Sequence, residues 1–535
     1  MRTAPAPISR RLARLLALVA TALTLGLGLG SCSRPGPEIA ILAGSENKAL
    51  EPLVQEFCTA RGARCSFTYQ GSLDIGFGLR ATATPLAADI VWPAASIWID
   101  LFDEGRRVRH LTSISQSPVV LGIRRSKAQA LGWTTRDVTT ADIIDAVERG
   151  DLKFLMSSAT QSNSGAGAYL AMLTTAVGRD DVLTEAALAS TEVRRKARAL
   201  LRGVERSSGS SGWLGELFLD QDQRGIRYDA MWNYEAVLKE TNETLVARGG
   251  EPLWLVYPKD GVAVSDGPLG LVDRGRGQEV ESFVLDLQKF LLSGDAQTRI
   301  AATGRRIPLG RADAARPVAE WNFDPSRPIT AVRPPDPKVI WAALNLYQEA
   351  LRRPSLSGLC LDVSGSMEGA GIRQLREAMA FLFTPETTRG LLVQWSPDDR
   401  IHAIPFASTP GALQQGSGAA PDQARLKAWG AQLRADGGTD MYACARAALR
   451  AMAADLGTGK FLGAIVIMTD GRSQGDLSGF LADWRRDGHK VPVFGITFGD
   501  ADRSQLDHLA GETGGRVFDG RSGLVEAFRA VRGYN

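Results

Sequence analysis

The sequence predicts an α/β protein with two folded units, and three observations support this fold class. From about residue 355 to the C-terminus, compact apolar segments alternate with amphipathic stretches at helical spacing. A similar alternation covers about residues 38–310. Between the two regions, a segment at 311–338 is rich in charge and carries Pro317, Pro325, Pro328, Pro334, Pro335 and Pro337. Because proline disfavours helix interiors and central strands, we expect this segment to be an extended, semi-rigid spacer at the domain boundary.

The N-terminal residues 1–31 have the features of a secretory signal. Arg2, Arg10, Arg11 and Arg14 precede an apolar stretch that ends in Leu29-Gly30-Ser31-Cys32. This ending resembles a bacterial lipobox. The resemblance implies that Cys32 becomes the lipidated first residue of a membrane lipoprotein on the extracytoplasmic face. An uncleaved membrane anchor is the alternative, although the stretch is just short of the roughly 17 to 25 residues that span a bilayer.

Charge and cysteine content restrict the classes of function. The formal net charge of +3 includes the four signal arginines, so the mature chain carries about −1, which gives no support for a nucleic-acid partner. In an exported chain, Cys58 and Cys65 are expected to form a local disulfide. Buried free thiols are expected at Cys360 and Cys444, with a second bridge left open. The chain has no C-x-x-C pair of the kind that indicates zinc.

Residues 38–310 have their own order of strands and turns. Strands are expected at 39–43, 65–69 and 88–93, with a helix from residue 44 to about 61. Further segments at 118–123, 257–270 and 290–308 fit two crossings between lobes and a closing segment. This arrangement resembles the class II periplasmic solute-binding proteins, which include phosphate and molybdate receptors. The resemblance implies a two-lobed domain over residues 32–310 with a solute site between the lobes.

Four serines in this region are candidates for solute binding. Ser45, Ser72, Ser162 and Ser164 occupy turns that precede expected helices. Helix N-termini have unpaired amides and a favourable dipole, so they favour an anion. Capping of the helices by the same side chains is the alternative, and it needs no ligand. The anion is not defined by the sequence, and sugars, peptides and proteins stay open as ligands.

The C-terminal unit, residues 339–535, is expected to begin with an amphipathic helix and to continue as a parallel sheet covered by helices. The first helix, 339–352, carries Trp341, Leu344, Tyr347 and Leu351 on one stripe and is expected to pack on a neighbouring domain. Strands are expected up to residue 362 and at 391–395, 401–404, 465–468 and 491–496. Helices are expected at 372–382, 421–435, 443–454, 477–484, 504–513 and 523–531. This order predicts a Rossmann-like sandwich.

Three loops of this unit carry oxygen-bearing side chains. Asp362, Ser364 and Ser366 follow the first strand, Thr439 lies in a later loop, and Asp470 ends another strand. Open α/β sheets place ligand sites at the carboxyl ends of their strands. A hard cation such as Mg²⁺ prefers oxygen ligands and often keeps positions for water or an external carboxylate. The pattern therefore predicts a protein-binding metal site. Helix capping by Asp362 and Ser364 is the alternative.

This D-x-S-x-S, T and D set resembles the metal ion-dependent adhesion site of von Willebrand factor A (VWA) domains. The resemblance covers roughly residues 355–535 and implies that Ser364, Ser366 and Thr439 bind Mg²⁺ or Mn²⁺, directly or through water. Asp362 and Asp470 would lie beside the ion. Because hydroxyls are neutral, the ion would attract an acidic residue of a partner protein.

Two functions from different classes follow, with a remote third. In the first, a membrane-anchored binding protein captures a partner through the metal site, and the solute-binding-like domain is a sensor or scaffold. In the second, the chain is the solute receptor of an ABC-type uptake system, with an oxyanion as one candidate solute, docked through its metal domain. The third is a serine hydrolase, because residues 471–475 match G-x-S-x-G with Ser473 as nucleophile and His489 or His508 as base. That model leaves Asp362 and Thr439 without a role, so no catalytic residue is assigned.

Overall fold

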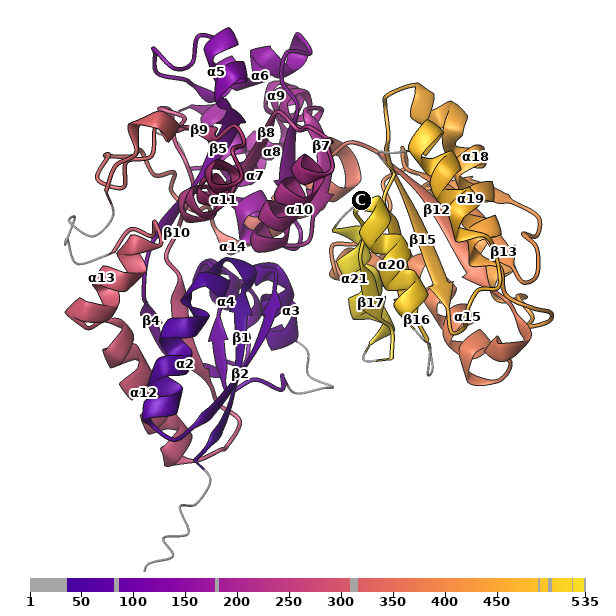
Figure 1. Ribbon diagram of the computed structural model, residues 1–535, viewed down its shortest axis with the longest axis horizontal. Helices are drawn as coiled ribbons and strands as arrows, with labels where there is room; N and C mark the ends of the chain where they lie inside the picture. Colours follow the sequence, from indigo (N-terminus) through magenta and orange to yellow (C-terminus); the bar gives the residue numbers. More distant parts are fainter. Residues whose placement is uncertain are drawn as a thin grey trace, which may run out of the picture.

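The computed structural model describes residues 36–80, 86–178, 182–307, 316–488, 491–498, 503–521 and 523–533. The expected signal peptide and Cys32 lie outside the described residues. Within the described ranges, none of the helices is both long and apolar enough to cross a membrane. The fold is mixed α/β, with two lobes from the first part of the chain and a separate α/β unit from the C-terminal part (Figure 1).

Lobe 1 is built on a five-stranded sheet in the order β2-β1-β3-β11-β4. Its strands are β1 (Glu38–Gly44), β2 (Arg64–Gln70), β3 (Ile90–Trp92), β4 (Val108–Ser113) and β11 (Pro268–Val272). Its helices are η1 (Ser45–Leu50), α2 (Glu51–Ala60), α3 (Ser72–Arg80), α4 (Ile97–Phe102), α12 (Gln278–Leu291) and α13 (Gly294–Ala302). The first three strands pair in parallel, and β11 returns antiparallel from the second lobe.

Lobe 2 is built on a mixed sheet that contains β10-β5-β8-β6-β7, with β9 paired to β5. The strands are β5 (Ser117–Arg124), β6 (Phe154–Ser157), β7 (Val204–Ser208), β8 (Ala230–Tyr234), β9 (Leu253–Val256) and β10 (Val264–Ser265). The helices are α5 (Arg125–Ala130), α6 (Thr140–Glu148), α7 (Asn163–Val177), α8 (Glu185–Ala189), α9 (Thr191–Leu201), α10 (Ser211–Gln223) and α11 (Glu235–Ala247). The chain crosses between the lobes from β4 to β5 and from β10 to β11, as the sequence predicts.

The connecting segment lies against lobe 2. In its described part, Trp321 of the turn η2 (Ala319–Trp321) and Phe323 belong to a core cluster of that lobe, and Ala331 bridges to Val262. The expected amphipathic helix is present as α14 (Pro337–Leu346) and continues as the π-turn η3 (Tyr347–Leu351). Its buried stripe packs into the largest core cluster of the two lobes. The spacer is therefore extended but packed.

The C-terminal unit has a six-stranded sheet in the order β14-β13-β12-β15-β16-β17, parallel except for β14. Its strands are β12 (Ser355–Asp362), β13 (Arg400–Phe406), β14 (Gln414–Ser417), β15 (Leu462–Thr469), β16 (Val493–Thr497) and β17 (Val517–Asp519). Its helices are η4 (Gly365–Met367), α15 (Ala370–Leu382), α16 (Pro385–Gly390), α17 (Ala420–Gly430), α18 (Met441–Gly457), α19 (Leu477–Asp483), η5 (Trp484–Gly488), α20 (Ser504–Thr513) and α21 (Leu524–Arg532). Helices cover the sheet on its two faces (Figure 1), so its central strands are buried on both sides.

The prediction of a strand at residues 391–395 is wrong. This segment is a turn followed by irregular chain, and Leu392 takes a left-handed conformation with a φ of 57°. A strand residue does not adopt that angle. The apolar side chains that suggested a strand are buried instead in tertiary contacts: Leu392 packs with the core of the lobes, and Trp395 donates from Nε1 to the carbonyl of Leu382 at 2.9 Å. An apolar run alone does not distinguish a strand from a buried loop.

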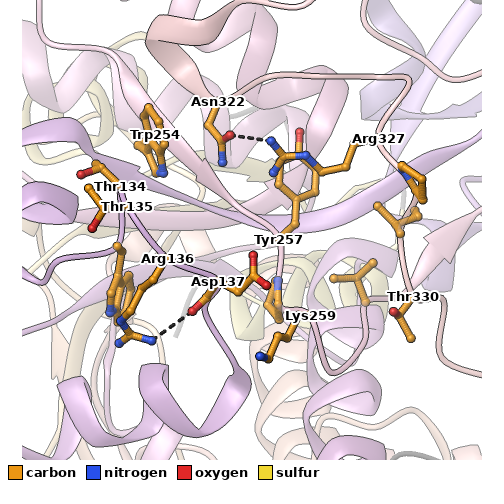
Figure 2. A pocket seen from close by; sticks show the side chains of 15 residues that line it. Thr134, Thr135, Arg136, Asp137, Trp254, Tyr257, Lys259, Asn322, Arg327 and Thr330 are labelled. Carbon is orange, nitrogen blue, oxygen red and sulfur yellow. Dashed lines mark hydrogen bonds between the residues drawn. The ribbon is translucent and has the colours of Figure 1, made fainter.

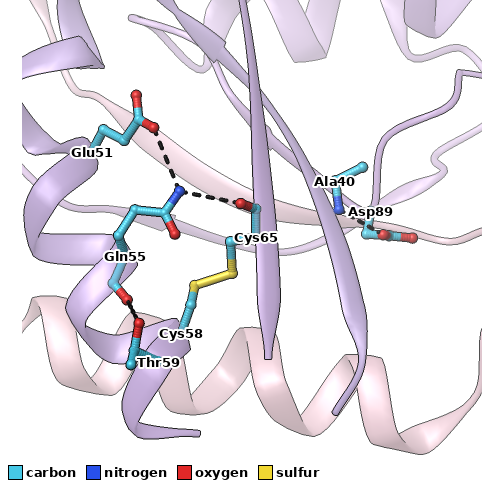
Figure 3. The surroundings of a disulfide bond; sticks show 7 residues. All are labelled: Ala40, Glu51, Gln55, Cys58, Thr59, Cys65 and Asp89. Carbon is cyan, nitrogen blue, oxygen red and sulfur yellow. Dashed lines mark hydrogen bonds between the residues drawn. A yellow bond between two sulfur atoms is a disulfide. The ribbon is translucent and has the colours of Figure 1, made fainter. Parts of the chain in front are cut away.

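Two disulfides are present among the described residues. Cys58 on α2 is joined to Cys65 on β2 (Figure 3). Cys360 is joined to Cys444, with 5.9 Å between the two Cα atoms, so the expectation of buried free thiols there is wrong. The physical reason is the packing of α18 on β12, which brings the two buried sulfurs together across a sequence separation of 84.

The second disulfide is expected to stabilise the chain more than the first. In the chain-entropy model, a cross-link with a sequence separation of 84 contributes about 4.6 kcal/mol, and one with a separation of 7 contributes about 2.5 kcal/mol. Cys360→Ala/Cys444→Ala should therefore lower the free energy of unfolding more than Cys58→Ala/Cys65→Ala. Guanidinium titration of the three proteins measures the difference, and an equal loss in both variants would contradict it.

Candidate functional site

The parallel pairing of β12 and β15 sets the position of the predicted metal ligands. Leu361 pairs with Met468, so Asp362 and Thr469 leave the sheet side by side. The loop before α18 reaches the same edge, because Gly365 N donates to Gly437 O at 2.9 Å and Gln474 N donates to Thr439 O at 3.0 Å. The three predicted loops therefore meet at the carboxyl end of the sheet.

The side chains of these loops are in contact with one another. Ser366 Oγ donates to Asp470 Oδ1 at 2.8 Å and lies 3.1 Å from Ser364 Oγ. Ser364 N donates to Asp362 Oδ1 at 2.8 Å. A Cβ atom on Gly471 would lie 3.4 Å from Ser366 Oγ and 3.6 Å from Thr439 Oγ1, which places Thr439 at the same cluster. The structure thus brings together the five side chains that the sequence singles out.

Burial divides the site into an inner and an outer part. Asp362 and Ser364 are buried, whereas Asp470 and Thr439 are half-buried and Ser366 is exposed. Burial raises the pKa of the Asp362 carboxyl, and the nearby Asp470 adds to this, although hydrogen bonds from Ser364 and Thr469 oppose it. The outer hydroxyl and carboxylate face solvent, where an external ligand could reach them.

Sequence reasoning missed Thr469. Its hydroxyl donates to Asp362 Oδ2, and it accepts from Gly471 N at 3.0 Å. Thr469 therefore orients the buried carboxylate and the Asp470 turn at the same time. Its place at the end of β15, one residue before Asp470, is the signal that could have identified it.

The donor set fits a hard divalent cation. All five predicted ligands offer oxygen, from two carboxylates and three hydroxyls, and Asp470 is close enough to contribute to the raised pKa of Asp362. Among the described residues no group of three or more His, Cys, Asp or Glu side chains is placed for another metal. The site chemistry therefore favours Mg²⁺ or Mn²⁺ over zinc.

The Ser473 hydroxyl has a structural role. It accepts from Met441 N at 3.1 Å and from Gly475 N at 3.2 Å. These bonds fix the start of α18 and the turn before α19. His489, one of the two bases considered for a hydrolase, lies outside the described residues.

The four candidate serines of the first domain are buried and bonded within the protein. Ser45 Oγ accepts from Gly212 N at 2.9 Å, and Ser72 Oγ accepts from Ala94 N at 2.9 Å. Ser164 Oγ lies 2.7 Å from Ser157 Oγ and 3.2 Å from Ser162 Oγ. The Ser45 bond joins lobe 1 to lobe 2. These hydroxyls lie at the starts of helices, as expected, but these bonds join them to other segments or to other serines, and neither η1 nor α7 has a side-chain cap.

The lobes touch directly across the cleft. Leu73 N of lobe 1 donates to Gln161 O of lobe 2 at 3.0 Å, and Ser211 Oγ donates to Glu46 Oε2 at 2.9 Å. A cavity lined by both lobes at Glu46, Tyr234 and Arg305 has a volume of only about 20 Å³, enough for about one water molecule.

A larger hollow lies on lobe 2, where it meets the connecting segment (Figure 2). It has a volume of about 690 Å³, and Trp254, Tyr257, Asn322 and Arg327 line it. The Arg327 guanidinium lies 4.8 Å from the centre of the Tyr257 ring and donates to Asn322 Oδ1 at 2.6 Å. These contacts bind the connecting segment to lobe 2, and no sequence pattern predicted the hollow.

Glu46 makes the stability of the closed lobes depend on pH. Burial raises the pKa of its carboxyl to about 7, and Oε1 has no hydrogen-bond partner in the described part of the chain. Because the pKa is raised on folding, the stabilisation is present at low pH and is lost as the pH rises through about 7. Glu46→Gln should remove this loss and raise the free energy of unfolding at pH 8 by about 3 kcal/mol. Denaturant titrations from pH 5 to 9 test this, with the exposed Glu56→Gln as control. Parallel profiles for the wild type and Glu46→Gln would contradict it.

Two family models match separate parts of the chain. Residues 39–306 match the family model "Bacterial extracellular solute-binding protein", and residues 358–524 match "von Willebrand factor type A domain". No curated protein matches the chain.

Solved structures give distant similarities. The periplasmic binding protein AfuA from Actinobacillus pleuropneumoniae is 14% identical over 54% of this chain and 91% of its own, with a TM-score of 0.39. The ferric binding protein from Campylobacter jejuni is 13% identical over 58% and 98%, with a TM-score of 0.42. A von Willebrand factor type A protein from Catenulispora acidiphila is 17% identical over 35% and 43%, with a TM-score of 0.28. Because the first family model covers half of the sequence, the chain belongs to the bacterial extracellular solute-binding protein family, and a VWA domain follows its solute-binding domain.

Proposed function

We propose that this chain is an exported binding protein whose VWA domain uses a divalent cation to capture an acidic residue of a partner protein. The observation that carries the proposal is the meeting of Asp362, Ser364, Ser366, Thr439 and Asp470 at one edge of the sheet. The lipobox-like ending at Cys32 supports attachment to the membrane by lipid, on the extracytoplasmic side. The family of the first domain supports an extracytoplasmic location.

Each residue has a defined part in this proposal. Ser364, Ser366 and Thr439 would hold Mg²⁺ or Mn²⁺ directly or through water, with Asp362 and Asp470 beside it. The cation would supply a Lewis-acidic position for an external carboxylate. Thr469 and the amide of Ser364 hold the Asp362 carboxylate in place. The exposed Ser366 and half-buried Asp470 leave the outer side of the site open to a partner.

Neither domain belongs to a family defined by an enzyme activity, and we assign no catalytic residue. The first domain would serve as a scaffold or sensor for the VWA domain. Its family membership favours a second candidate function, that of a solute receptor in an ABC-type uptake system. Oxyanions are among the solutes such a receptor could bind. The direct contacts across the cleft and the small cavity favour the scaffold.

Metal binding should depend on the inner residues of the site. Asp362→Ala and Ser364→Ala should weaken Mg²⁺ or Mn²⁺ binding by at least about tenfold, because each removes a ligand or its support. Isothermal titration calorimetry measures the affinity. Ser478→Ala, which removes an exposed hydroxyl on α19, is the matched control and should bind metal as the wild type does. Undiminished binding by Asp362→Ala would refute the site.

Partner capture should require both the metal and an acidic group. A pull-down from the native envelope with Mg²⁺ should recover a protein that is lost with chelator and with Asp362→Ala. An acidic peptide in excess should compete, whereas the same peptide with Asn and Gln in place of Asp and Glu should not. Metal-independent recovery would contradict this mode of capture even if the calorimetry shows a metal site.

A further inference from the structure

We propose that the cleft between the two lobes is held shut by downstream segments of the same chain, the connecting helix α14 and the C-terminal helix α21. These segments occupy a surface to which both lobes contribute. The proposal goes beyond partner capture and does not depend on metal binding.

Arg529 of α21 contacts both lobes. Its guanidinium pairs with Asp74 Oδ1 of lobe 1 at 2.8 Å and lies 3.4 Å from the centre of the Phe77 ring. The same group donates to Thr160 O of lobe 2 at 3.3 Å. The Arg529 side chain is only 6% exposed and that of Asp74 is 22% exposed, so the ion pair is largely shielded from solvent. One buried side chain of the VWA domain thus joins α3 of lobe 1 to the loop before α7 of lobe 2.

Gln161, a residue of lobe 2, contacts both lobe 1 and the VWA domain. Its side-chain amide donates to the carbonyl of Arg529, and its main-chain carbonyl accepts from Leu73 N of lobe 1. Gly533 lies so close to the Gln161 side chain that a Cβ atom there would collide with it. The C-terminal helix of the VWA domain therefore packs closely against Gln161, at a point where the two lobes are in contact.

A second three-way contact lies on α10. Glu216 of lobe 2 pairs with Lys48 of lobe 1 at 3.0 Å and with Arg516 of the VWA domain at 3.0 Å. The Arg516 guanidinium also lies 4.4 Å from the centre of the Trp213 ring. Nearby, Arg206 Nη2 donates to Gly514 O at 2.8 Å. Gly514 and Arg516 thus bind the VWA domain to lobe 2 through a second segment of the chain, separate from the helix that carries Arg529.

The connecting helix joins the lobes through apolar contacts. The Trp341 ring lies 6.3 Å from Phe77 and 6.1 Å from Phe102 of lobe 1, measured between ring centres. On the lobe 2 side, Tyr169 donates from its hydroxyl to Ala343 O at 2.9 Å, and its ring lies 5.2 Å from that of Tyr347. Residues of both lobes and of α14 form one continuous buried cluster. Separating the lobes would expose this apolar surface to water.

The surface used by these segments also carries two of the candidate residues for solute binding. Asp74 lies two residues after Ser72, and Gln161 directly precedes Ser162, the candidate serines at the starts of α3 and α7. The chain's own segments and a solute would therefore compete for the cleft.

Hydrogen exchange of the full chain tests the proposal. The amides of Leu73 and Gly212 donate to acceptors on the opposite lobe, so their exchange reports lobe separation. Arg529→Glu should speed their exchange at least tenfold, and Arg529→Glu/Trp341→Ser should speed it further. Asp74→Arg added to Arg529→Glu should restore slow exchange by reversing the ion pair. Arg486→Glu, an exposed charge reversal elsewhere on the VWA domain, should have no effect.

Peptides from β1 and β5 should stay protected in every variant, which shows that each lobe remains folded. If β1 and β5 are protected and the exchange of Leu73 and Gly212 in Arg529→Glu/Trp341→Ser equals that of the wild type, the proposal is wrong. If Arg529→Glu does not fold, Asp74→Lys breaks the same ion pair from lobe 1. It should likewise speed the exchange of Leu73 and Gly212 at least tenfold, and wild-type exchange in that variant would also show that the proposal is wrong.

Discussion

The parallel pairing of β12 with β13 and β15 is the constraint on which the candidate metal site depends. It places the end of β12 beside the end of β15, so that Asp362 and Asp470 emerge at one edge. A shift of register by one residue would turn Asp362 to the other face of the sheet. The Cys360–Cys444 disulfide acts on the same arrangement, because it ties the strand before Asp362 to the helix after Thr439. The bridge and the sheet together fix the distance between two of the three ligand loops.

Much of this site could be predicted from sequence because its parts are local. Each ligand follows directly on a strand or precedes a helix, and parallel strands bring their carboxyl ends to one edge. The partner of Cys360 could not be predicted, since it depends on the orientation of α18 on the sheet. The turn at Leu392 was missed for a related reason. Its side chain is buried by contact with the lobes, so it is apolar without belonging to a strand.

The contacts that close the cleft could not be predicted from the sequence. Gln161 and Arg529 are 368 positions apart, and no local sequence pattern relates one to the other. The candidate serines were correctly placed at the starts of helices, but no local pattern shows that Ser45 bonds to the amide of Gly212 on the other lobe. A family resemblance describes the inherited fold. Whether the polar groups of that fold bind a solute or bind each other is decided by contacts between distant segments.

The packing of α14 has a practical consequence for dividing the chain. The proline-rich segment is the natural place to cut according to composition, yet the helix after it completes the apolar core beneath Tyr169, Phe77 and Phe102. A fragment that stops before Pro337 would leave those rings facing water, and its tendency to aggregate would reflect the position of the cut rather than the nature of the domain. A fragment that runs through Leu351 keeps the contacts of α14 with these rings and loses only the cover that Arg529 provides over Phe77.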